Sequence, residues 1–119
     1  MNVPDASSTS SVQPALRGEP PRPPQATKLS EMESLIARGL ELLAGGDVAG
    51  GRLLLTRAAE AGEARASLAL AGSYDAPVMG YLGIVDAAPD PVKARAWYMK
   101  AAQQGSPEAS RRLQRMAGG

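Results

Sequence analysis

Apolar residues recur every three to four positions through most of the chain, which is the spacing of one face of an α-helix. The clearest run starts at Met32 and stops at the pair Gly45 and Gly46. Just before it, Ser30 and Glu33 match a capping box, in which each side chain bonds to the other residue's backbone N–H. The pattern therefore predicts a first helix that starts at Ser30 and stops at the two glycines.

Further helices are predicted wherever capping residues, glycines and prolines interrupt this periodicity. Asp47 and Asp90 stand where an aspartate can accept the first free N–H groups of a helix. Gly62 and Gly105 can adopt the left-handed conformation that ends one. Ser106 followed by proline repeats the capping signature. The predicted helices cover residues 30–44, 47–62, 63–74, 90–105 and 106–117.

Two stretches fit this scheme less simply. Gly50 and Gly51 lie in the first turns of the second helix, where each should weaken it by about 1 kcal/mol relative to alanine. Residues 77–85 are too apolar for an ordinary exposed loop. We expect residues 77–82 to form a short extra turn and the whole run 77–85 to fold back over the hairpin core. The alternative is an exposed apolar patch that docks a partner.

The N-terminal residues 1–28 are rich in serine and proline and have no hydrophobic period. Such a stretch cannot bury enough apolar surface to offset its ordering entropy, so a disordered tail is predicted. Residues 20–24 contain a PxxP pattern, which fits either a stiff linker or a peptide ligand. The folded domain is expected to cover residues 29–117.

The second and fourth predicted helices are copies of one unit. A shift of 43 residues, the separation of Gly62 from Gly105, also places Asp47 on Asp90. Self-similarity with a period of 20–50 residues indicates a solenoid of stacked units. The same shift aligns Leu54 with Trp97, and both are expected to be buried at equivalent places.

At these positions the chain resembles the Sel-one-like repeat, a relative of the tetratricopeptide repeat. Ala66, Leu70 and Tyr74 occupy the positions of the motif A-x-x-x-L-G-x-x-Y, with Ala71 in place of its glycine. The second motif, D-x-x-K-A-x-x-W-Y-x-K-A-A-x-x-G, is matched by Asp90, Lys93, Ala94, Trp97, Tyr98, Lys100, Ala101, Ala102 and Gly105. The first unit is degenerate, and the chain has Asp86 and Ala87 where the family has Gly-Val.

The resemblance implies an all-α fold, a short right-handed α-solenoid of antiparallel helical hairpins with about two and a half repeats. It also implies a non-enzymatic role as a scaffold or adaptor that binds another protein. The alternative function is a terminal structural module, or a fragment, of a larger envelope-anchored repeat protein. The oligomeric state cannot be derived from this pattern.

Composition excludes several other classes of function. The chain has 13 basic and 12 acidic residues, so no basic excess suggests nucleic-acid binding. Because histidine and cysteine are absent, imidazole catalysis, thiol chemistry and Cys/His metal sites are excluded, and we expect no enzyme activity, cofactor or metal. No signal peptide or membrane-spanning run is evident. The expected compartment is the cytoplasm, or the periplasm if the chain belongs to an anchored precursor.

Candidate chemical groups have simpler structural interpretations. Trp97 and Tyr98 could form a ligand cage, but aromatic residues beside alanines more often fill the groove between packed helices. Asp75 and Asp86 could form a carboxylate cluster with Asp90, but aspartate is common in turns and caps. Ser106 has no base to activate it and is interpreted as a cap.

The predicted partner-binding residues lie on the third helix. In helical-hairpin repeats the first helix of each unit usually lines the concave side. We expect the inward face of this helix to consist of Ala66, Leu70, Ala71 and Tyr74. The residues one position away from that face then remain on the concave surface, where a partner can contact them. These candidate partner-binding residues are Arg65, Leu68, Gly72 and Asp75.

Overall fold

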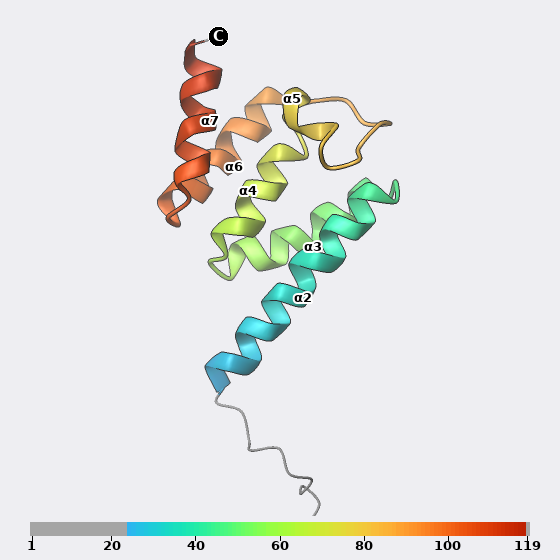
Figure 1. The fold of residues 1–119 in the computed structure, drawn as a ribbon, viewed down its shortest axis with the longest axis vertical. Coiled ribbons are helices and arrows are strands. Elements are labelled where there is room, and N and C mark those ends of the chain that lie inside the picture. Colours follow the sequence, from blue (N-terminus) through green and yellow to red (C-terminus); the bar gives the residue numbers. More distant parts are fainter. Residues whose placement is uncertain (1–23, 119) are drawn as a thin grey trace, which may run out of the picture.

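The computed structural model describes residues 24–118, and within that range all regular structure is α-helical (Figure 1). The all-α prediction is therefore confirmed. The six helices are α2 (Pro24–Ala44), α3 (Val48–Glu60), α4 (Ala64–Gly72), α5 (Ala76–Met79), α6 (Pro91–Gln103) and α7 (Pro107–Gly118).

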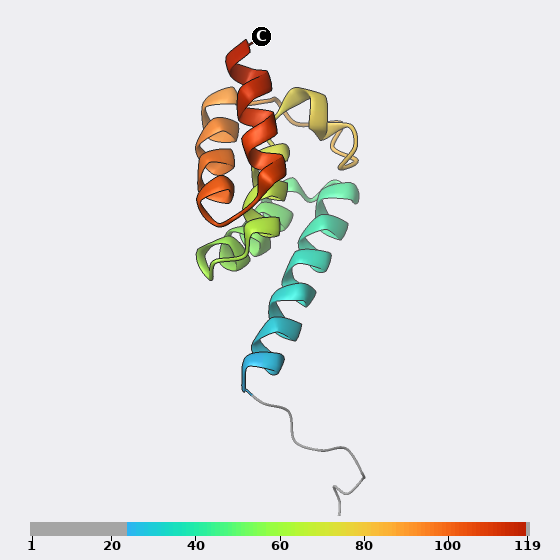
Figure 2. The same cartoon turned by 60° about the vertical axis from the view of Figure 1, so that its left-hand side comes forward.

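Each long helix packs mainly on the long helices next to it in the chain. Contacts join α2 to α3, α3 to α4, α4 to α6, and α6 to α7. In Figure 2, α6 and α7 lie side by side, whereas α2 stands at the opposite end of the molecule and extends beyond the other helices. The short helix α5 contacts the end of α4. The chain thus forms a row of helices with α4 in the middle.

The predicted N-terminal caps are present at three helices. Asp47 accepts a hydrogen bond from the backbone N–H three residues later at 2.9 Å. Asp90 makes the same bond at 3.2 Å, and so does Ser106. Each bond satisfies one of the N–H groups that a helix start leaves without an intrahelical partner. These predictions are confirmed.

The helix ends follow one pattern as well. Gly46, Gly62 and Gly105 have φ angles of 99°, 102° and 106°, in the left-handed region. The residue after each glycine donates its N–H to the carbonyl five residues before it, at 2.8, 3.1 and 2.9 Å. This is the hydrogen bond of a Schellman motif. The sequence therefore located three helix ends correctly.

The predicted start of the first helix is wrong. Helix α2 begins at Pro24 and continues through Ser30, so Ser30 is not its N-cap and the capping box is not used. A proline suits the first helical position, and Gln25, Ala26 and Lys28 favour helix. Residues 24–28 of the predicted tail are therefore helical, and the helical part begins before residue 29. The rest of that tail, and most of the PxxP segment, lie outside the described residues.

The core consists of two apolar clusters that meet at α4. Tyr74 and Trp97 are partly buried and contact both clusters. The first cluster joins α2, α3 and α4 with α5 and the segment after it, and the second joins α4, α6 and α7. Their buried members are Ile36, Leu43, Leu55, Ala58, Ala59, Ala66, Leu70, Met79 and Ile84 in the first, and Ala71, Ala94, Tyr98, Ala101 and Ala109 in the second.

The expectation that Leu54 and Trp97 are both buried needs correction. Both are only half-buried, and the fully buried residues are their neighbours Leu55 and Tyr98. The equivalence of the two units survives, because Leu55 and Tyr98 are also related by the shift of 43 residues. In each of the two helices, the fully buried residue is therefore the one directly after the residue that was expected to be buried.

The apolar segment 77–85 folds back as predicted. Helix α5 supplies the short extra turn, and Met79 and Ile84 enter the first cluster with 6% and 5% of their surface exposed. Two of its large apolar side chains do not join them. Tyr81 and Val85 are 91% and 87% exposed. The segment therefore covers the core and at the same time displays an aromatic ring.

Two glycines allow α2 and α3 to pack closely. A Cβ added to Gly51 would lie 2.7 Å from the carbonyl oxygen of Gly39 and 2.8 Å from a side-chain carbon of Leu43. A Cβ added to Gly39 would lie 2.9 Å from Leu55. Contacts this short require the helices to move apart. Gly51 thus has a packing role that its low helix propensity did not reveal.

Candidate partner-binding surface

The four predicted partner-binding residues do not form one exposed surface. Arg65 is exposed and makes only a loose ion pair with Glu63 at 3.9 Å. Leu68 is half-buried against the second cluster. Gly72 is buried, and Asp75 is only 5% exposed. The predicted arrangement is therefore wrong for Gly72 and Asp75.

Gly72 is covered by a segment of the same chain. A Cβ at this position would lie 2.8 Å from Val78 and 3.4 Å from Leu82. The glycine makes room for the α5 segment and leaves no space for a partner. Helical spacing along α4 could not show this, because the covering residues come from beyond the end of that helix.

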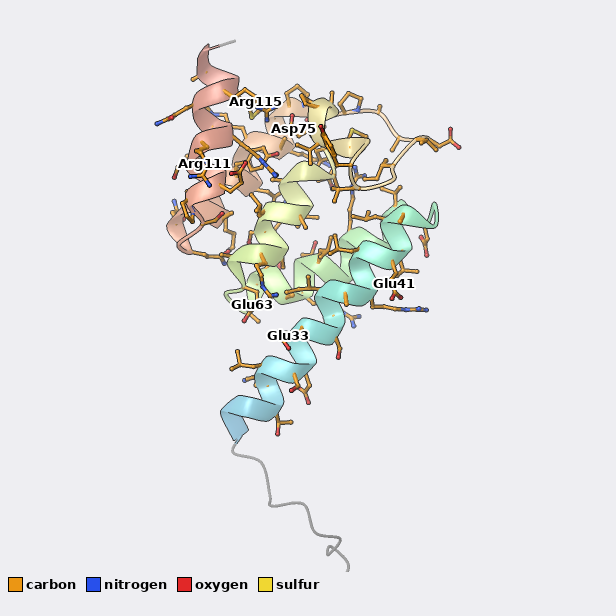
Figure 3. The ribbon with its side chains drawn as sticks, viewed as in Figure 1. Glu33, Glu41, Glu63, Asp75, Arg111 and Arg115 are labelled. Carbon is orange, nitrogen blue, oxygen red and sulfur yellow. The ribbon has the colours of Figure 1, made fainter. Side chains whose placement is uncertain are left out.

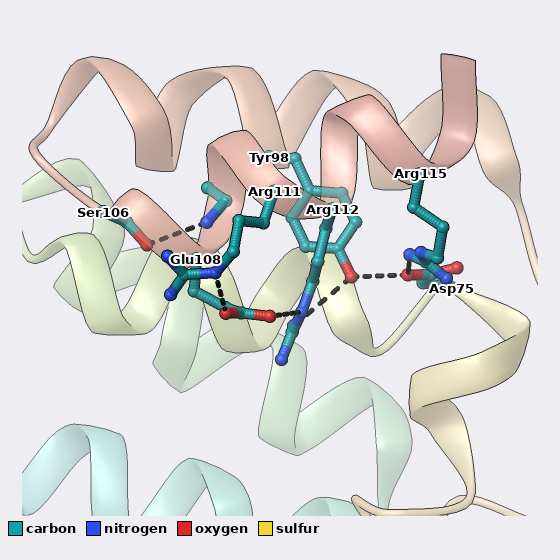
Figure 4. Close-up of polar contacts among 8 residues, drawn as sticks. Asp75, Tyr98, Ser106, Glu108, Arg111, Arg112 and Arg115 are labelled. Atoms are coloured by element: carbon teal, nitrogen blue, oxygen red, sulfur yellow. Dashed lines mark hydrogen bonds and ion pairs between the residues drawn. The ribbon is translucent and has the colours of Figure 1, made fainter. Parts of the chain in front are cut away.

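Asp75 is buried because two other helices satisfy its charge. The hydroxyl of Tyr98 on α6 donates to Oδ2 of Asp75 at 2.5 Å, and Arg115 on α7 forms an ion pair with the same oxygen (Figure 4). Burial, followed by the hydrogen bond to Asp75, raises the pKa of Tyr98 to about 12. The hydrogen bond to Asp75 also raises the pKa of Arg115. A buried carboxylate of this kind needs such partners.

Glu108 organises the other two arginines of α7. Its two oxygens accept hydrogen bonds from Nε of Arg111 at 2.9 Å and Nε of Arg112 at 3.1 Å (Figure 4). These bonds lower the pKa of Glu108. The guanidinium carbon of Arg112 also lies 5.6 Å from the ring centre of Tyr98. All three arginines of α7 are therefore held by contacts within the chain.

A groove of about 340 Å³ lies between α5 and α7. We call it the α5–α7 groove. One wall comes from α5 and the residues after it, and the other comes from α7. The lining residues are Pro77, Val78, Tyr81, Glu108, Arg111, Arg112 and Arg115.

Sequence reasoning missed this groove, although part of the signal was present. Arg111, Arg112 and Arg115 are spaced to lie near one another on a helix. In the sequence, Tyr81 is only one of the apolar residues of the run 77–85. The groove exists because α5 folds back beside α7, and no local pattern predicts that juxtaposition.

Two further polar links hold α4 against its neighbours. Arg52 on α3 donates through Nε to the hydroxyl of Ser73 at 2.9 Å and stacks 3.8 Å from the ring centre of Tyr74. The side chain of Gln104 accepts from Ser67 at 2.6 Å and donates to the carbonyl of Ala59 at 2.9 Å. These bonds join α3, α4 and the end of α6, so the helices that support the groove are linked by side-chain hydrogen bonds.

The other candidate groups do not assemble a chemical site. Tyr98 is fully buried and Trp97 packs between the clusters, as the packing interpretation expects. Within residues 24–118, no group of three or more acidic side chains is placed to hold a metal ion. No helix in that range combines the length and the apolar character needed to cross a membrane.

Charge is distributed unevenly between the two ends of the molecule. Residues 90–118 contain six basic and two acidic side chains, whereas residues 24–89 contain five basic and eight acidic ones. Figure 3 shows Arg111 and Arg115 on α7, at the end opposite Glu33 and Glu41 on α2. The α7 wall of the α5–α7 groove therefore lies in the basic part of the chain, whereas its α5 wall belongs to residues 24–89.

None of the protein-family models, curated proteins or solved structures compared with this chain matches it. A proposal for its function therefore depends on its own residues and their geometry.

Proposed function

We propose that this chain is a non-enzymatic protein-interaction module, a scaffold or adaptor built from Sel-one-like repeats. In this proposal α2 with α3 and α4 with α6 are two hairpins of a short right-handed solenoid, and α7 begins a third. The matching caps at Asp47 and Asp90, and the matching left-handed glycines at Gly62 and Gly105, support the repeat. Solenoids commonly use such stacked helices to bind other proteins.

The observation that carries the interaction role is the exposure of Tyr81. Its ring is 91% exposed, although the neighbouring Met79 and Ile84 anchor its segment in the core. Ordered aromatic side chains beside arginines are the composition of protein–protein hot spots. The α5–α7 groove brings Tyr81 next to the arginines of α7.

A capture experiment with in-place cross-linking tests this role. The full chain is immobilised, incubated with a cell extract, cross-linked and analysed by mass spectrometry. Reproducible cross-links from another protein to α5 or α7 are expected. The interaction role is rejected if no protein is retained above the level bound by a heat-unfolded sample of the same chain.

The alternative role as a terminal structural module is favoured by the outward face of α7. Ser110 and Gln114 are exposed on this helix. The shift of 43 residues aligns Gln114 with Ala71, which is buried between α4 and α6. Terminal units of solenoids carry such a polar outer face. A purely structural module would retain no partner in the capture experiment, so the same measurement separates the two roles.

A further inference from the structure

We infer that the α5–α7 groove binds an acidic segment of another protein, with carboxylates on the arginines of α7 and an apolar side chain against Tyr81. This inference rests on the interaction role proposed above and adds the chemistry of the partner. Its support comes from the donors that the arginines leave available, from the fixed positions of these side chains, and from the charge of the surface around them.

The arginines keep hydrogen-bond donors that face solvent. A guanidinium carries five N–H donors, and Glu108 occupies only Nε of Arg111 and Nε of Arg112. The side chains of Arg111, Arg112 and Arg115 are 65%, 25% and 41% exposed. A carboxylate entering the groove can therefore bond to the terminal nitrogens of Arg111 without displacing Glu108, whereas Nη1 of Arg112 already donates to the hydroxyl of Tyr98 at 3.4 Å and Nη2 of Arg115 is bound to Asp75.

The groove is organised before any partner binds. Arg115 is held by the buried carboxylate of Asp75, and Glu108 holds Arg111 and Arg112. On the opposite wall, Val78 packs directly over Gly72, where a Cβ would lie only 2.8 Å from it. This close contact positions α5. Side chains that are already ordered lose less entropy on binding, so more of the contact energy appears as affinity.

Charge complementarity selects the partner. Three arginines of α7 meet two acids at the groove, Glu108 in its lining and Asp75 beneath it, so this site carries an excess of positive charge. An acidic segment would be attracted to this surface, whereas a basic one would be repelled. Tyr81 adds an amphipathic ring that contacts an apolar side chain at little entropic cost. Carboxylates next to an apolar residue therefore match both walls.

The test uses fluorescence anisotropy with the full chain and a fluorescein-labelled peptide made of four Glu-Glu-Leu repeats. A peptide of four Gln-Gln-Leu repeats is the uncharged comparison. The acidic peptide should bind at least about tenfold more tightly, and raising the salt from about 20 to 200 mM should weaken it markedly. If the acidic peptide does not bind, the groove does not recognise carboxylates.

Matched variants locate the binding site. Arg111→Ala and Tyr81→Ala should each weaken binding of the acidic peptide about three- to tenfold. Arg38→Ala is the control for charge, because Arg38 is also 65% exposed and also forms an i,i+3 ion pair with a glutamate. Val92→Ala is the control for exposed apolar surface, since Val92 is 78% exposed on α6. All four residues are exposed, and a circular dichroism melt of each variant verifies that the fold is kept.

Three results would overturn the inference. The first is no binding of the acidic peptide at about 1 mM, and the second is equal weakening by the groove variants and by their controls. The third is a wild-type dimer that Arg111→Ala dissociates, which would make the occupant the acidic α2 of a second copy. If either of the first two occurs while the capture experiment still yields a partner, only the partner chemistry fails. If capture fails as well, the interaction role fails with it.

Discussion

At the scale of single residues, Asp75 shows how a side chain changes its role through distant partners. It lies directly before α5, and helical spacing alone predicts that its carboxylate faces solvent. Tyr98 and Arg115 lie 23 and 40 residues further along the chain and both bind its Oδ2. Asp75 therefore connects the α4–α5 junction with α6 and α7, and removal of either partner would leave its buried carboxylate with less compensation, which is destabilising.

The hydroxyl of Tyr98 should give the fold a specific alkaline sensitivity. Its pKa rises from 10.0 to about 12, so the folded chain holds this proton more tightly than the unfolded chain does. The resulting stability is complete below pH 10 and is lost as the pH rises towards 12, by about 2–3 kcal/mol. Tyr98→Phe should remove this pH dependence and should cost about 1–3 kcal/mol at pH 8, because Asp75 loses a donor.

Urea denaturation between pH 8 and pH 12 measures both effects. Tyr81→Phe is the control for the loss of a tyrosine hydroxyl as such, because Tyr81 is exposed and does not pack in the core. A Tyr98→Phe chain that loses stability above pH 10 as steeply as the wild type would show that another group is responsible.

At the scale of elements, close packing of α2 on α3 depends on residues without side chains. Gly39 and Gly51 face each other where the two helices cross. The flanking Leu43 and Leu55 are fully buried beside them. Helix propensity alone treats Gly51 as a weakness, yet the crossing needs it because any Cβ would meet the opposite backbone.

Gly51→Ala should therefore destabilise the fold, contrary to its helix propensity. Propensity favours alanine by about 1 kcal/mol, but the added Cβ would overlap Gly39 and Leu43, and we expect a net loss of about 1–3 kcal/mol. Denaturant midpoints measure this change. Gly80→Ala is the matched control: its Cβ would meet nothing within 4 Å, and its φ of −62° suits alanine. A Gly51→Ala chain as stable as the wild type would contradict the close-packing argument.

Two substitutions in the α5 segment, at Met79 and at Tyr81, should change the stability of the fold by very different amounts. Met79→Ala removes a buried side chain from the first cluster and should cost about 2–5 kcal/mol. Tyr81→Ala removes an exposed ring and should change stability by no more than about 0.5 kcal/mol. Thermal melts of the two variants compare them directly. Equal losses would mean that Tyr81 also packs on the core, and the α5–α7 groove would then lose its exposed aromatic wall.

At the scale of the whole molecule, the row of helices is polar at both ends. On α2 the exposed residues include Glu33, Arg38 and Glu41, and on α7 they include Ser110 and Gln114. The buried hydrophobic residues of the described chain lie between Ile36 and Ala109, whereas other large apolar residues, such as Leu29 on α2 and Val92 on α6, are exposed. The buried apolar face of each long helix is therefore covered by a neighbouring helix of the row.

A chain shortened to begin at Pro24 should unfold at the same temperature as the full chain. Every residue of the two apolar clusters of the described chain is kept in it. A chain that begins at Ser34 should melt lower, because it lacks Met32, which packs on the first cluster. Circular dichroism melts decide between these outcomes. A lower midpoint for the chain that begins at Pro24 would show that residues 1–23 contribute to the fold.

The sequence by itself determined the features that depend on neighbours within a few residues. The caps at Asp47, Asp90 and Ser106, and the left-handed glycines at Gly62 and Gly105, use hydrogen bonds that span three to five residues. Such bonds form whenever the local residues allow them, so a linear pattern predicts them. The start of α2 is the exception, because a cap at Ser30 competes with helix-forming residues on its N-terminal side.

Only the tertiary structure decided which side chains remain accessible. Gly72 is covered by Val78, Asp75 accepts a hydrogen bond from α6 and pairs with an arginine of α7, and Tyr81 is exposed although its neighbours Met79 and Ile84 are buried. Exposure depends on how separate helices pack, and the free energy of that packing is shared among residues far apart in the chain. Periodicity along α4 therefore identified its inward face correctly but placed two of the four partner-binding candidates wrongly, and it could not indicate the groove between α5 and α7.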